Sequence, residues 1–529
     1  MPRWEGWAAF PSPRSTRDDT GGRVTDIMAN AALGFGIALS WNNLLFCLIG
    51  VTLGTAIGVL PGLGPAATIA LLLPITYRMD AIASLILLAG IYYGAMYGGS
   101  ITSILVKVPG EGASVVTCLD GYAMARRGRA GAALGLSAFG SFIAGVIGTV
   151  GVFLLGPPLA AVALAFGPAE YAALVVVGLV LVTHVAQSTR SASLAMIAAG
   201  LLLATLGVDP IYGTERFTFG QLDLFDGVPV AILAMGLFGV AELLAVASSR
   251  GGAPAPIYPP GQVRELLPSR EEWRESAPAI ARGTGLGFFL GLLPGGGALI
   301  ASFASYVIEK RLSPQPERFG QGAPAGLAGP ESANNTAAQA AFVPLLSLGI
   351  PANVVMGVMM GGLLIQGIQP GPRLLATRPD LYWAVICSML IGNVMLIILN
   401  VPLISIFVQL LRIPFAVLSP LIILFCAIGA FSLRNSAFDV ALMVGFGVAG
   451  WLLRRAKFDP APLVLAFVLG DILERSVRQA LLVGQGSPAI FLQRPISAGL
   501  LALAVLLLLW PALRSVRGRF APAPLGPGS

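Results

Sequence analysis

The stretch GVLPGLGPAATIA, residues 58–70, interrupts an apolar segment with prolines and glycines. It recurs as GLLPGGGALIASF at residues 291–303, so the two Leu-Pro-Gly sequences lie 233 positions apart (294 − 61). Proline removes a backbone N–H group, and glycine lets the chain turn. Each stretch is therefore expected to end one helix and to begin another.

A second pair of interrupted stretches follows the first in each half of the chain. ITSILVKVPGEGAS (101–114) corresponds to FVPLLSLGIPANVV (342–355), and their Pro residues before the break lie 242 positions apart (351 − 109). Self-similarity at a nearly constant spacing is the sequence signature of repeated architecture. Two matching pairs in the same order predict two internal repeats.

The composition indicates a membrane protein. Of the 529 residues, 56% are hydrophobic and only 11% are charged, whereas a soluble domain carries about 25% charged residues. Several apolar runs approach the length of about 20 residues that spans a hydrocarbon core, and about eleven hydrophobic segments are expected. We therefore predict an all-α fold, a polytopic transmembrane helical bundle with broken or re-entrant helices. The clearest apolar runs are 31–57, 130–156, 191–207, 228–248, 381–411, 413–432 and 498–513.

The run 166–207 is long enough for two crossings. His184, Gln187 and Arg190 near its middle predict a turn between them. His184, the single histidine, could relay protons, but a polar residue at a helical turn is the simpler interpretation.

The net charge of +7 is small for this length and lies in loop clusters, which indicates topology rather than nucleic-acid binding. Loops rich in Lys and Arg stay in the cytoplasm, so these clusters are placed there. Clusters on both sides of 283–308 would conflict with a single crossing and favour a re-entrant hairpin. The clusters are 125–129, the arginines between 250 and 282, 310–311, 454–457 and 514–519.

The same features divide the chain into five parts. The first residues are polar and lack an apolar signal core. The expected parts are a disordered N-terminal extension (1–27), a first transmembrane half (28–249), a cytoplasmic linker (250–282), a second transmembrane half (283–513) and a cytoplasmic tail (514–529).

The broken segments predict a binding site. In lipid, non-helical backbone survives only where it is buried in protein or lines a watery cavity. A helix that begins at depth presents a partial positive charge, and one that ends there presents a partial negative charge. Paired interruptions at corresponding positions of two halves point to the site of a secondary transporter. The alternative is that they are glycine-rich loops or close helix contacts.

The ordered motifs resemble one known family. GVLPGLGP, YGGSITSILVKVPGEGASVVTCLDGYAMARRGRAGAALG, LPGGG and ANNTAAQAAFVPLLSLGIPANVVMGVMMGGLLIQGIQPGP are similar to the large membrane subunit (TctA family) of tripartite tricarboxylate transporters, from about Met28 to Trp510. The resemblance implies a multi-pass permease of the bacterial inner membrane. It also implies a small membrane subunit of the TctB type and a periplasmic solute-binding protein of the TctC type. The implied substrates are di- or tricarboxylates, carried with sodium ions or protons.

The chain departs from the family pattern in two places. The loop that usually reads Gly-Ile-Pro-Gly is GIPAN here, with Ala352 and Asn353. In the first half, Glu111 follows Pro-Gly where a small or hydroxyl residue is commoner. Both changes put in doubt whether the ligand set of a citrate carrier transfers unchanged.

The candidate substrate or ion site uses neutral groups. Hydroxyls, amides and backbone N–H groups can hold carboxylates without a fixed countercharge that would resist release. A sodium ion would take carbonyl, hydroxyl and amide oxygens from the same loops, and no other cofactor or metal is expected. The candidates for backbone approach are Pro61, Gly62, Gly64, Gly98, Gly99, Pro109, Gly110, Pro294, Gly295, Gly296 and Pro351. The candidates for side-chain contact are Ser100, Thr102, Ser103, Thr117, Ser332, Asn334, Asn335, Thr336 and Asn353.

Two ionisable residues complete the candidate set. Lys107 lies inside an apolar run and either contacts the substrate or extends its amine to the membrane surface. Asp120 either ties the turn before the basic loop or takes part in ion coupling. By contrast, Asp471 with Arg475 and Glu474 with Arg478 have the spacing of helical surface ion pairs.

The sequence predicts an ion-gradient-driven transporter subunit and no enzyme. A passive channel fits the broken segments too, and a membrane-embedded enzyme is a weaker alternative because one histidine and four scattered cysteines offer no catalytic cluster. No GxxxxGK[ST] loop for nucleotide phosphates is present. Expected contacts are the carboxylate, the two partner subunits and lipid, with no nucleic acid.

Overall fold

The computed structural model describes residues 20–60, 64–186, 188–209, 212–248, 263–294, 297–411, 413 and 415–520. Nearly all of this part is helical, and the predicted all-α polytopic bundle is confirmed. Four of the candidate residues, Pro61, Gly62, Gly295 and Gly296, lie outside the described residues.

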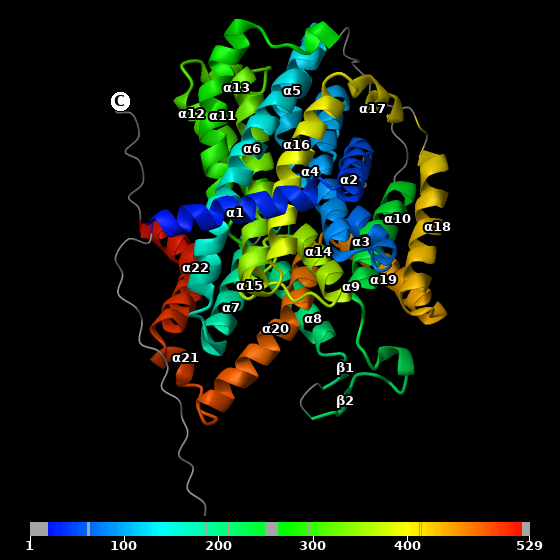
Figure 1. The fold of residues 1–529 in the computed structure, drawn as a ribbon, viewed down its shortest axis with the longest axis vertical. Helices are drawn as coiled ribbons and strands as arrows, with labels where there is room; N and C mark the ends of the chain where they lie inside the picture. Colours follow the sequence, from blue (N-terminus) through cyan, green and yellow to red (C-terminus); the bar gives the residue numbers. More distant parts are fainter. Residues whose placement is uncertain are drawn as a thin grey trace, which may run out of the picture.

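The first half of the chain forms a set of helices and one small hairpin of strands (Figure 1). The strands β1 (Gly207–Val208) and β2 (Glu215–Arg216) pair antiparallel after the eighth helix. The helices are α1 (Thr20–Ala38), α2 (Trp41–Val59), α3 (Pro65–Thr76), α4 (Ala81–Val106), α5 (Thr117–Met124), α6 (Ala130–Ala163), α7 (Pro168–Val185), α8 (Arg190–Ala204), α9 (Val230–Ala234) and α10 (Ala241–Ser248).

The second half continues with helices alone. These are α11 (Arg270–Gly291), α12 (Gly297–Leu312), α13 (Pro324–Ala340), α14 (Val354–Ile365), α15 (Leu374–Thr377), α16 (Pro379–Asn400), α17 (Ile404–Leu410), α18 (Phe415–Arg434), α19 (Ala437–Arg455), α20 (Ala461–Val483), α21 (Ile490–Gln493) and α22 (Pro495–Phe520).

Six helical segments in the described residues are long and apolar enough to cross a membrane: Trp41–Val59, Ala81–Val106, Thr117–Ala163, Val230–Ser248, Pro379–Asn400 and Ala437–Arg455. Seven further apolar helices have only 10–17 residues. The short helices arise where prolines and glycines interrupt an apolar run. The run 166–207, in which two crossings were expected, forms the two helices α7 and α8, which are separated by a break after Val185. His184 at that break contacts the carbonyl of Leu507 on α22, so it ties two helices together.

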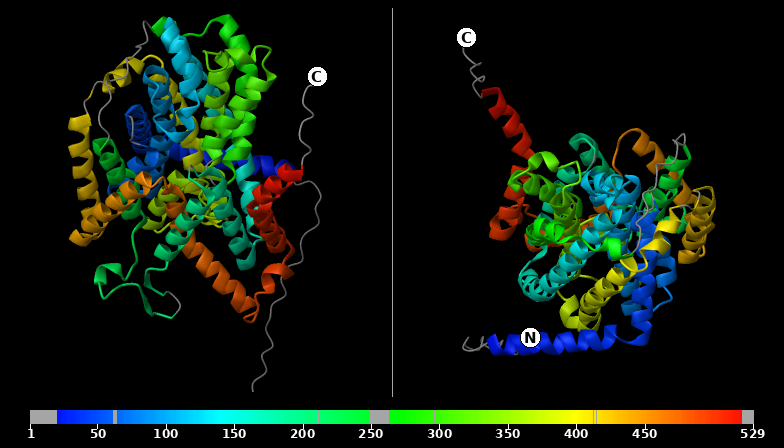
Figure 2. Two further views of the ribbon diagram at one scale, coloured as in Figure 1. Left: turned by 180° about the vertical axis from the view of Figure 1, so that it is seen from behind. Right: turned by 90° about the horizontal axis from the view of Figure 1, so that it is seen from above.

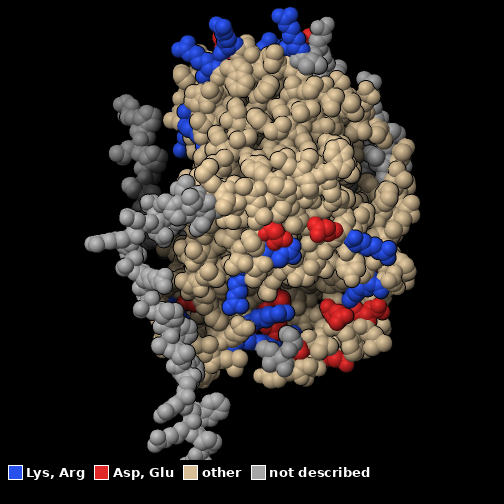
Figure 3. Space-filling view, in the orientation of Figure 1, with Lys and Arg blue, Asp and Glu red and all other residues tan. Residues whose placement is uncertain are grey.

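The broken stretches are hairpins, as expected. Helix α2 ends at Val59 and α3 begins at Pro65, while α11 ends at Gly291 and α12 begins at Gly297. At the open end of the second hairpin, Arg282 of α11 forms an ion pair with Glu309 of α12. The two outer ends of this helix pair therefore lie next to each other, as the expected re-entrant hairpin over 283–308 requires. Figure 3 shows basic side chains at this upper end of the molecule.

Helices α4 and α13 form the centre of the molecule. Every residue of α13 is buried, and so is every residue of α4 after Ala81. Such complete burial requires close neighbours on all sides. Helix α1 lies instead on the outside, packed against α16 (Figure 2).

Glycines bring each central helix against its neighbour. On α2, a Cβ at Gly50, Gly54 or Gly58 would lie 2.4–2.5 Å from a backbone oxygen of α4. On α11, a Cβ at Gly283, Gly287 or Gly291 would lie 2.2–2.5 Å from a backbone oxygen of α13. Only glycine allows such an approach.

These two glycine ladders are related by the internal repeat. Gly287 lies 233 positions after Gly54 (287 − 54), which is the spacing of the Leu-Pro-Gly pair. The oxygens that they face belong to Ile91 and Ala333, which lie 242 positions apart (333 − 91), the spacing of the second pair. The helix pair α2–α4 and the helix pair α11–α13 are thus two copies of one unit.

The helix bounds differ from the expected divisions at three places. Helix α1 begins at Thr20 within the extension expected over 1–27, and α11 begins at Arg270 within the linker expected over 250–282. Helix α22 extends to Phe520 within the tail expected over 514–529. Residues 1–19, 249–262 and 521–529 lie outside the described residues.

Candidate functional site

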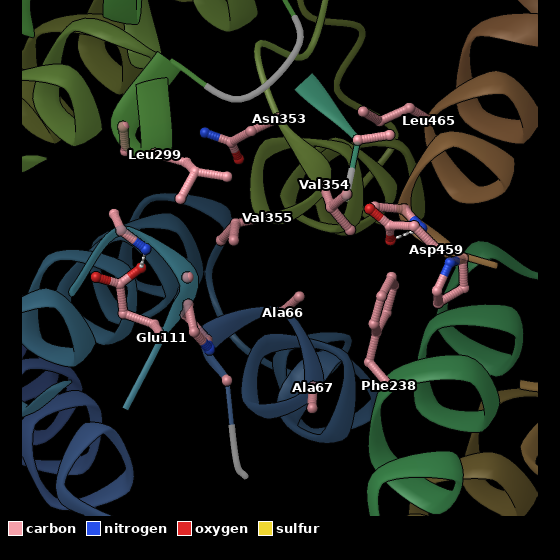
Figure 4. A pocket seen from close by; sticks show the side chains of 18 of the residues that line it. Ala66, Ala67, Glu111, Phe238, Leu299, Asn353, Val354, Val355, Asp459 and Leu465 are labelled. Carbon is pink, nitrogen blue, oxygen red and sulfur yellow. Dashed lines mark hydrogen bonds between the residues drawn. The ribbon is translucent and has the colours of Figure 1, made fainter. Parts of the chain in front are cut away.

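A pocket of about 890 Å³ lies where the interrupted segments of both halves meet. Its wall includes Gly64 and Pro65 after the first hairpin turn and the loop 109–113 after α4. The second half contributes Ala298 at the start of α12 and the segment 353–355 at the start of α14. Figure 4 shows Glu111, Leu299 and Asn353 approaching this space from different segments. The pocket is therefore shared by the two repeats.

Four helices begin at the pocket wall, and three of them, α3, α12 and α14, have no acidic residue at their start. Proline at the first position of α3 suits a helix start because its missing N–H would be unpaired there. Asn353 caps α14, since its Oδ1 accepts the N–H of Met356 at 3.0 Å. Helix α12 begins at Gly297, next to the lining residue Ala298. The positive ends of α3, α12 and α14 all favour an anion in the pocket.

Charged side chains complete the wall. Arg454 at the end of α19 forms an ion pair with Glu242 of α10. Asp459 caps α20 by accepting the N–H of Ala461 at 2.9 Å. Lys457 is exposed at the pocket, and the described residues include no ion pair for it. Lys457 is therefore the basic lining residue without an ion-pair partner among the described residues.

The loops from the two halves exchange hydrogen bonds with the opposite central helix. Glu111 and Asn353, which lie 242 positions apart (353 − 111), have nearly the same backbone angles, φ −150° and −155°. Asn334 of α13 donates from Nδ2 to Glu111 at 3.1 Å, and Asn353 donates from Nδ2 to the Tyr92 hydroxyl of α4 at 3.0 Å. Tyr92 and Asn334 are also 242 positions apart. The two bonds are a reciprocal pair across the repeat.

Comparison with known proteins agrees with this duplicated, interrupted architecture. The model of the "Tripartite tricarboxylate transporter TctA family" matches residues 44–465. The chain belongs to this family. The matched range begins within α2 and ends within α20, so it contains all the segments that line the pocket.

Two curated relatives from Agrobacterium vitis are similar to this TctA-family chain. One, called "Uncharacterized 52.8 kDa protein in TAR-I ttuC' 3'region", is 49% identical over 499 residues, covering 94% of this chain and 99% of that protein. The other, called "Uncharacterized protein in TAR-II ttuC' 3'region", is 50% identical over 234 residues, covering 44% of this chain and 97% of that protein. No solved structure matches the chain significantly.

Four of the candidate residues predicted from the sequence line the pocket of this TctA-family protein: Gly64, Pro109, Gly110 and Asn353. Gly110 has no room for a side chain, since a Cβ there would lie 2.3 Å from the backbone oxygen of Gly58. Pro294 and Pro351 are not part of the wall. Pro294 packs against Gly178 of α7.

Most of the hydroxyl and amide candidates instead connect buried helices. Thr102 donates to the carbonyl of Val59 at 2.9 Å, which holds α4 against the end of α2. Asn335 donates to Ser141 Oγ on α6 at 2.7 Å. These hydroxyl and amide residues, and the candidates Gly98 and Gly99 beside them, do not line the pocket. The residues in these helix contacts are Gly98, Gly99, Ser100, Thr102, Ser103, Thr117, Ser332, Asn334, Asn335 and Thr336.

Lys107 lies outside the pocket wall. It ends α4 in the left-handed conformation (φ 59°), at the position that corresponds to Gly349 (φ 72°) in the second half. Its amine lies 5.7 Å from the centre of the Tyr122 ring, and its side chain is exposed. This arrangement fits an anchoring role and gives no contact with a substrate in the pocket.

Asp120 ties together two distant parts of the chain. Its carboxylate accepts the N–H groups of Gly320, Gly322 and Ala323, with shortest distances of 2.9, 2.6 and 2.8 Å. These groups precede α13, so Asp120 fixes the loop that leads into the central helix of the second half.

Sequence reasoning did not select five charged residues that the structure places in or near the site: Glu242, Glu331, Arg454, Lys457 and Asp459. Glu331 on α13 is 1% exposed and bonds to hydroxyls of three helices. It precedes the polar run from Ser332 to Thr336, so that run was the available signal. Arg454 and Lys457 were considered only as part of a cytoplasmic basic cluster, and the structure adds that both line the pocket.

Proposed function

We propose that this chain is the carrier subunit of a tripartite system that imports di- or tricarboxylates across the bacterial inner membrane. In this proposal a periplasmic solute-binding protein of the TctC type delivers the substrate, and a small TctB-type membrane subunit completes the complex. An ion gradient of sodium or protons drives the transport. The family name supports the tricarboxylate class, and the pocket supports an anion.

One observation carries the proposal: interrupted segments of both repeats meet at one pocket, onto which the N-termini of α3, α12 and α14 open together with that of α20, which is preceded by Asp459. The partial positive charges of α3, α12 and α14 attract carboxylates without a fixed countercharge of their own. Lys457 adds one full positive charge on an exposed side chain. A substrate with two or three carboxylates can thus be held by separate groups on opposite walls.

The reciprocal bonds support a carrier in which both halves take part. Each loop is fixed by a residue of the other half, Glu111 by Asn334 and Asn353 by Tyr92. A movement of one half relative to the other would change both bonds at once. Access to the pocket could then alternate between the two sides of the membrane.

Uptake into proteoliposomes tests this proposal. The chain is reconstituted with its small membrane subunit, the binding protein is added outside, and labelled citrate, succinate and malate are tested under sodium and proton gradients. We expect accumulation above equilibrium that an ionophore abolishes and that needs the binding protein. Equilibration without accumulation would identify a channel, and no uptake of any carboxylate would refute the substrate class.

A further inference from the structure

The chemistry around Glu331 differs from that of the other buried carboxyl groups. Its Oε2 lies 2.6 Å from Ser100 Oγ of α4 and 3.0 Å from Ser137 Oγ of α6, and its Oε1 bonds to Thr117 of α5. All three neighbours are hydroxyls, and the carboxyl is 1% exposed. A hydroxyl donates one hydrogen and accepts others. This carboxyl can therefore stay hydrogen-bonded with or without a proton.

The Ser100 hydroxyl is positioned to accept a hydrogen bond from a protonated Glu331 carboxyl group. Its Oγ also lies 3.0 Å from the carbonyl oxygen of Met96, which can only accept a hydrogen bond. When the hydroxyl hydrogen points to Met96, the 2.6 Å contact with Glu331 requires a hydrogen from the carboxyl group. When the hydroxyl rotates, it donates to an ionised carboxylate instead. One rotation of a side chain thus serves both states.

Asp120 provides the contrast within the same fold. It is equally buried, but three of its partners are the backbone N–H groups of Gly320, Gly322 and Ala323, which can only donate, and the Tyr306 hydroxyl is a further partner. Such a set of backbone donors fixes the carboxylate to the loop that precedes α13. The Glu331 side chain has no backbone N–H donor of this kind among its hydrogen bonds in the described residues. Asp120 is therefore a structural carboxylate, whereas the hydroxyls around Glu331 can bond to both its protonated and its ionised form.

No cation compensates Glu331 among the described residues. Arg282 is paired with Glu309, and Lys107 lies over Tyr122. An ionised carboxylate so deeply buried costs several kcal/mol, which a proton removes. The titratable or charged groups on the elements around it include Tyr97, Lys107, Glu111, Cys118, Asp120, Arg282, Tyr306 and Glu309.

Glu331 lies close to the pocket. Asn334, one helical turn further along α13, donates to Glu111 at the pocket wall. A Cβ at Gly99 would lie 3.1 Å from Glu111, and the next residue, Ser100, bonds to Glu331. The Oδ1 atoms of Asn334 and Asn335 are buried acceptors without a donor. Unused acceptors one turn from a carboxyl favour a state in which it, or a water beside it, can donate.

We propose that Glu331 carries the coupling proton of this transporter, which rests on the proposed function. In the arrangement described above, where Glu331 is buried among hydroxyls, its side chain is a neutral carboxylic acid. Water on the side of entry supplies the proton, forming an O–H bond on the carboxylate and leaving one water molecule for each hydronium consumed. On the other side the O–H bond breaks and the proton returns to water. One proton then accompanies each transport cycle.

Infrared spectroscopy of the purified chain tests the protonation state without any substrate. We expect a C=O stretch of a buried carboxylic acid near neutral pH that is sensitive to deuterium and absent from Glu331→Gln. The exposed control Asp471→Asn keeps the band. Ser100→Ala, which removes one partner, moves the band while the protein remains folded. Absence of this band in the unmodified chain throughout the pH range of folding would overturn the proposal.

Transport in proteoliposomes separates this proposal from the proposed function. Glu331→Gln, which resembles the protonated acid, is expected to exchange labelled for unlabelled citrate but to lose accumulation driven by a pH gradient. A gradient of one unit can support about tenfold accumulation per proton, and this factor should fall to one. If the unmodified chain moves no carboxylate at all, the proposed function fails. If it accumulates citrate with a sodium gradient alone, or Glu331→Gln accumulates normally with a pH gradient, only the proton proposal fails.

Discussion

At the scale of single residues, the donors around a carboxyl group decide what it can do. Asp120 accepts three backbone N–H groups and joins the loop before α13 to α5. Glu111 caps a short 3₁₀ turn through the N–H of Ala113 and faces the pocket. Glu331 is surrounded by hydroxyls. The same functional group thus fixes a loop, shapes a binding wall or exchanges a proton.

Asp120→Asn is expected to destabilise the protein. The amide presents one acceptor oxygen where two now serve Gly320, Gly322 and Ala323. Loss of a charge-assisted bond and an unpaired buried donor together cost about 1–3 kcal/mol. Thermal unfolding in detergent should show a lower midpoint than in Asp471→Asn, where the carboxylate is exposed. Equal midpoints for the two variants would refute the structural role of Asp120.

Lys457→Gln is expected to weaken carboxylate uptake. The substitution removes a positive charge that has no ion-pair partner in the described part of the chain, but it keeps a long polar side chain. Loss of a hydrogen bond to a charged group corresponds to about tenfold or more in apparent affinity. The concentration dependence of citrate uptake should show a raised KM, while Lys310→Gln at the exposed end of α12 leaves it unchanged. An unaltered KM in Lys457→Gln would remove this amine from the site.

Some residues of the pocket could be predicted from the sequence and others could not, for physical reasons. Gly64, Pro109 and Gly110 were visible because a break in an apolar helix is rare and has few explanations. Lys457 was not, because a basic cluster indicates topology only on average. Its place in the pocket depends on how α19 and α20 pack against the loops of the first half, and no local pattern encodes that contact.

At the scale of helices, glycine ladders set the distance between the elements that hold the site. Gly54 of α2 and Gly287 of α11 both lie against the backbone of a central helix. The approach positions the hairpin turns that follow, and these turns lead to the pocket. The repeat and its breaks were predictable from the sequence. The partner of each glycine was not, because spacing along one helix does not identify the helix that it faces.

Gly287→Ala and Gly285→Ala on α11 form a matched pair. At Gly287 a Cβ would lie 2.3 Å from the backbone oxygen of Ala333, whereas at Gly285 it would meet nothing within 4 Å. Overpacking costs about 1–3 kcal/mol, and alanine otherwise gains about 0.5–1 kcal/mol over glycine in a helix. The unfolding midpoint should fall in Gly287→Ala and stay or rise in Gly285→Ala. Similar midpoints would show that α11 and α13 do not pack as described.

At the scale of the whole molecule, the two repeats form one site. Each half contributes a hairpin and a capped loop, and each loop bonds to the central helix of the opposite half. The duplication was predicted from two sequence offsets. The reciprocal bonds were not, because they depend on how the halves face each other. The central claim is that a carboxylate binds at this junction.

Protection of engineered cysteines by a carboxylate tests that claim most directly. Ala298→Cys and Val354→Cys place thiols on the pocket wall contributed by the second half, and Leu222→Cys provides an exposed control. The four native cysteines are buried, so they should react slowly. The account predicts that citrate slows labelling of both pocket thiols by a charged thiol reagent and leaves the control unchanged. Labelling of the pocket thiols that is unaffected by any di- or tricarboxylate would contradict it.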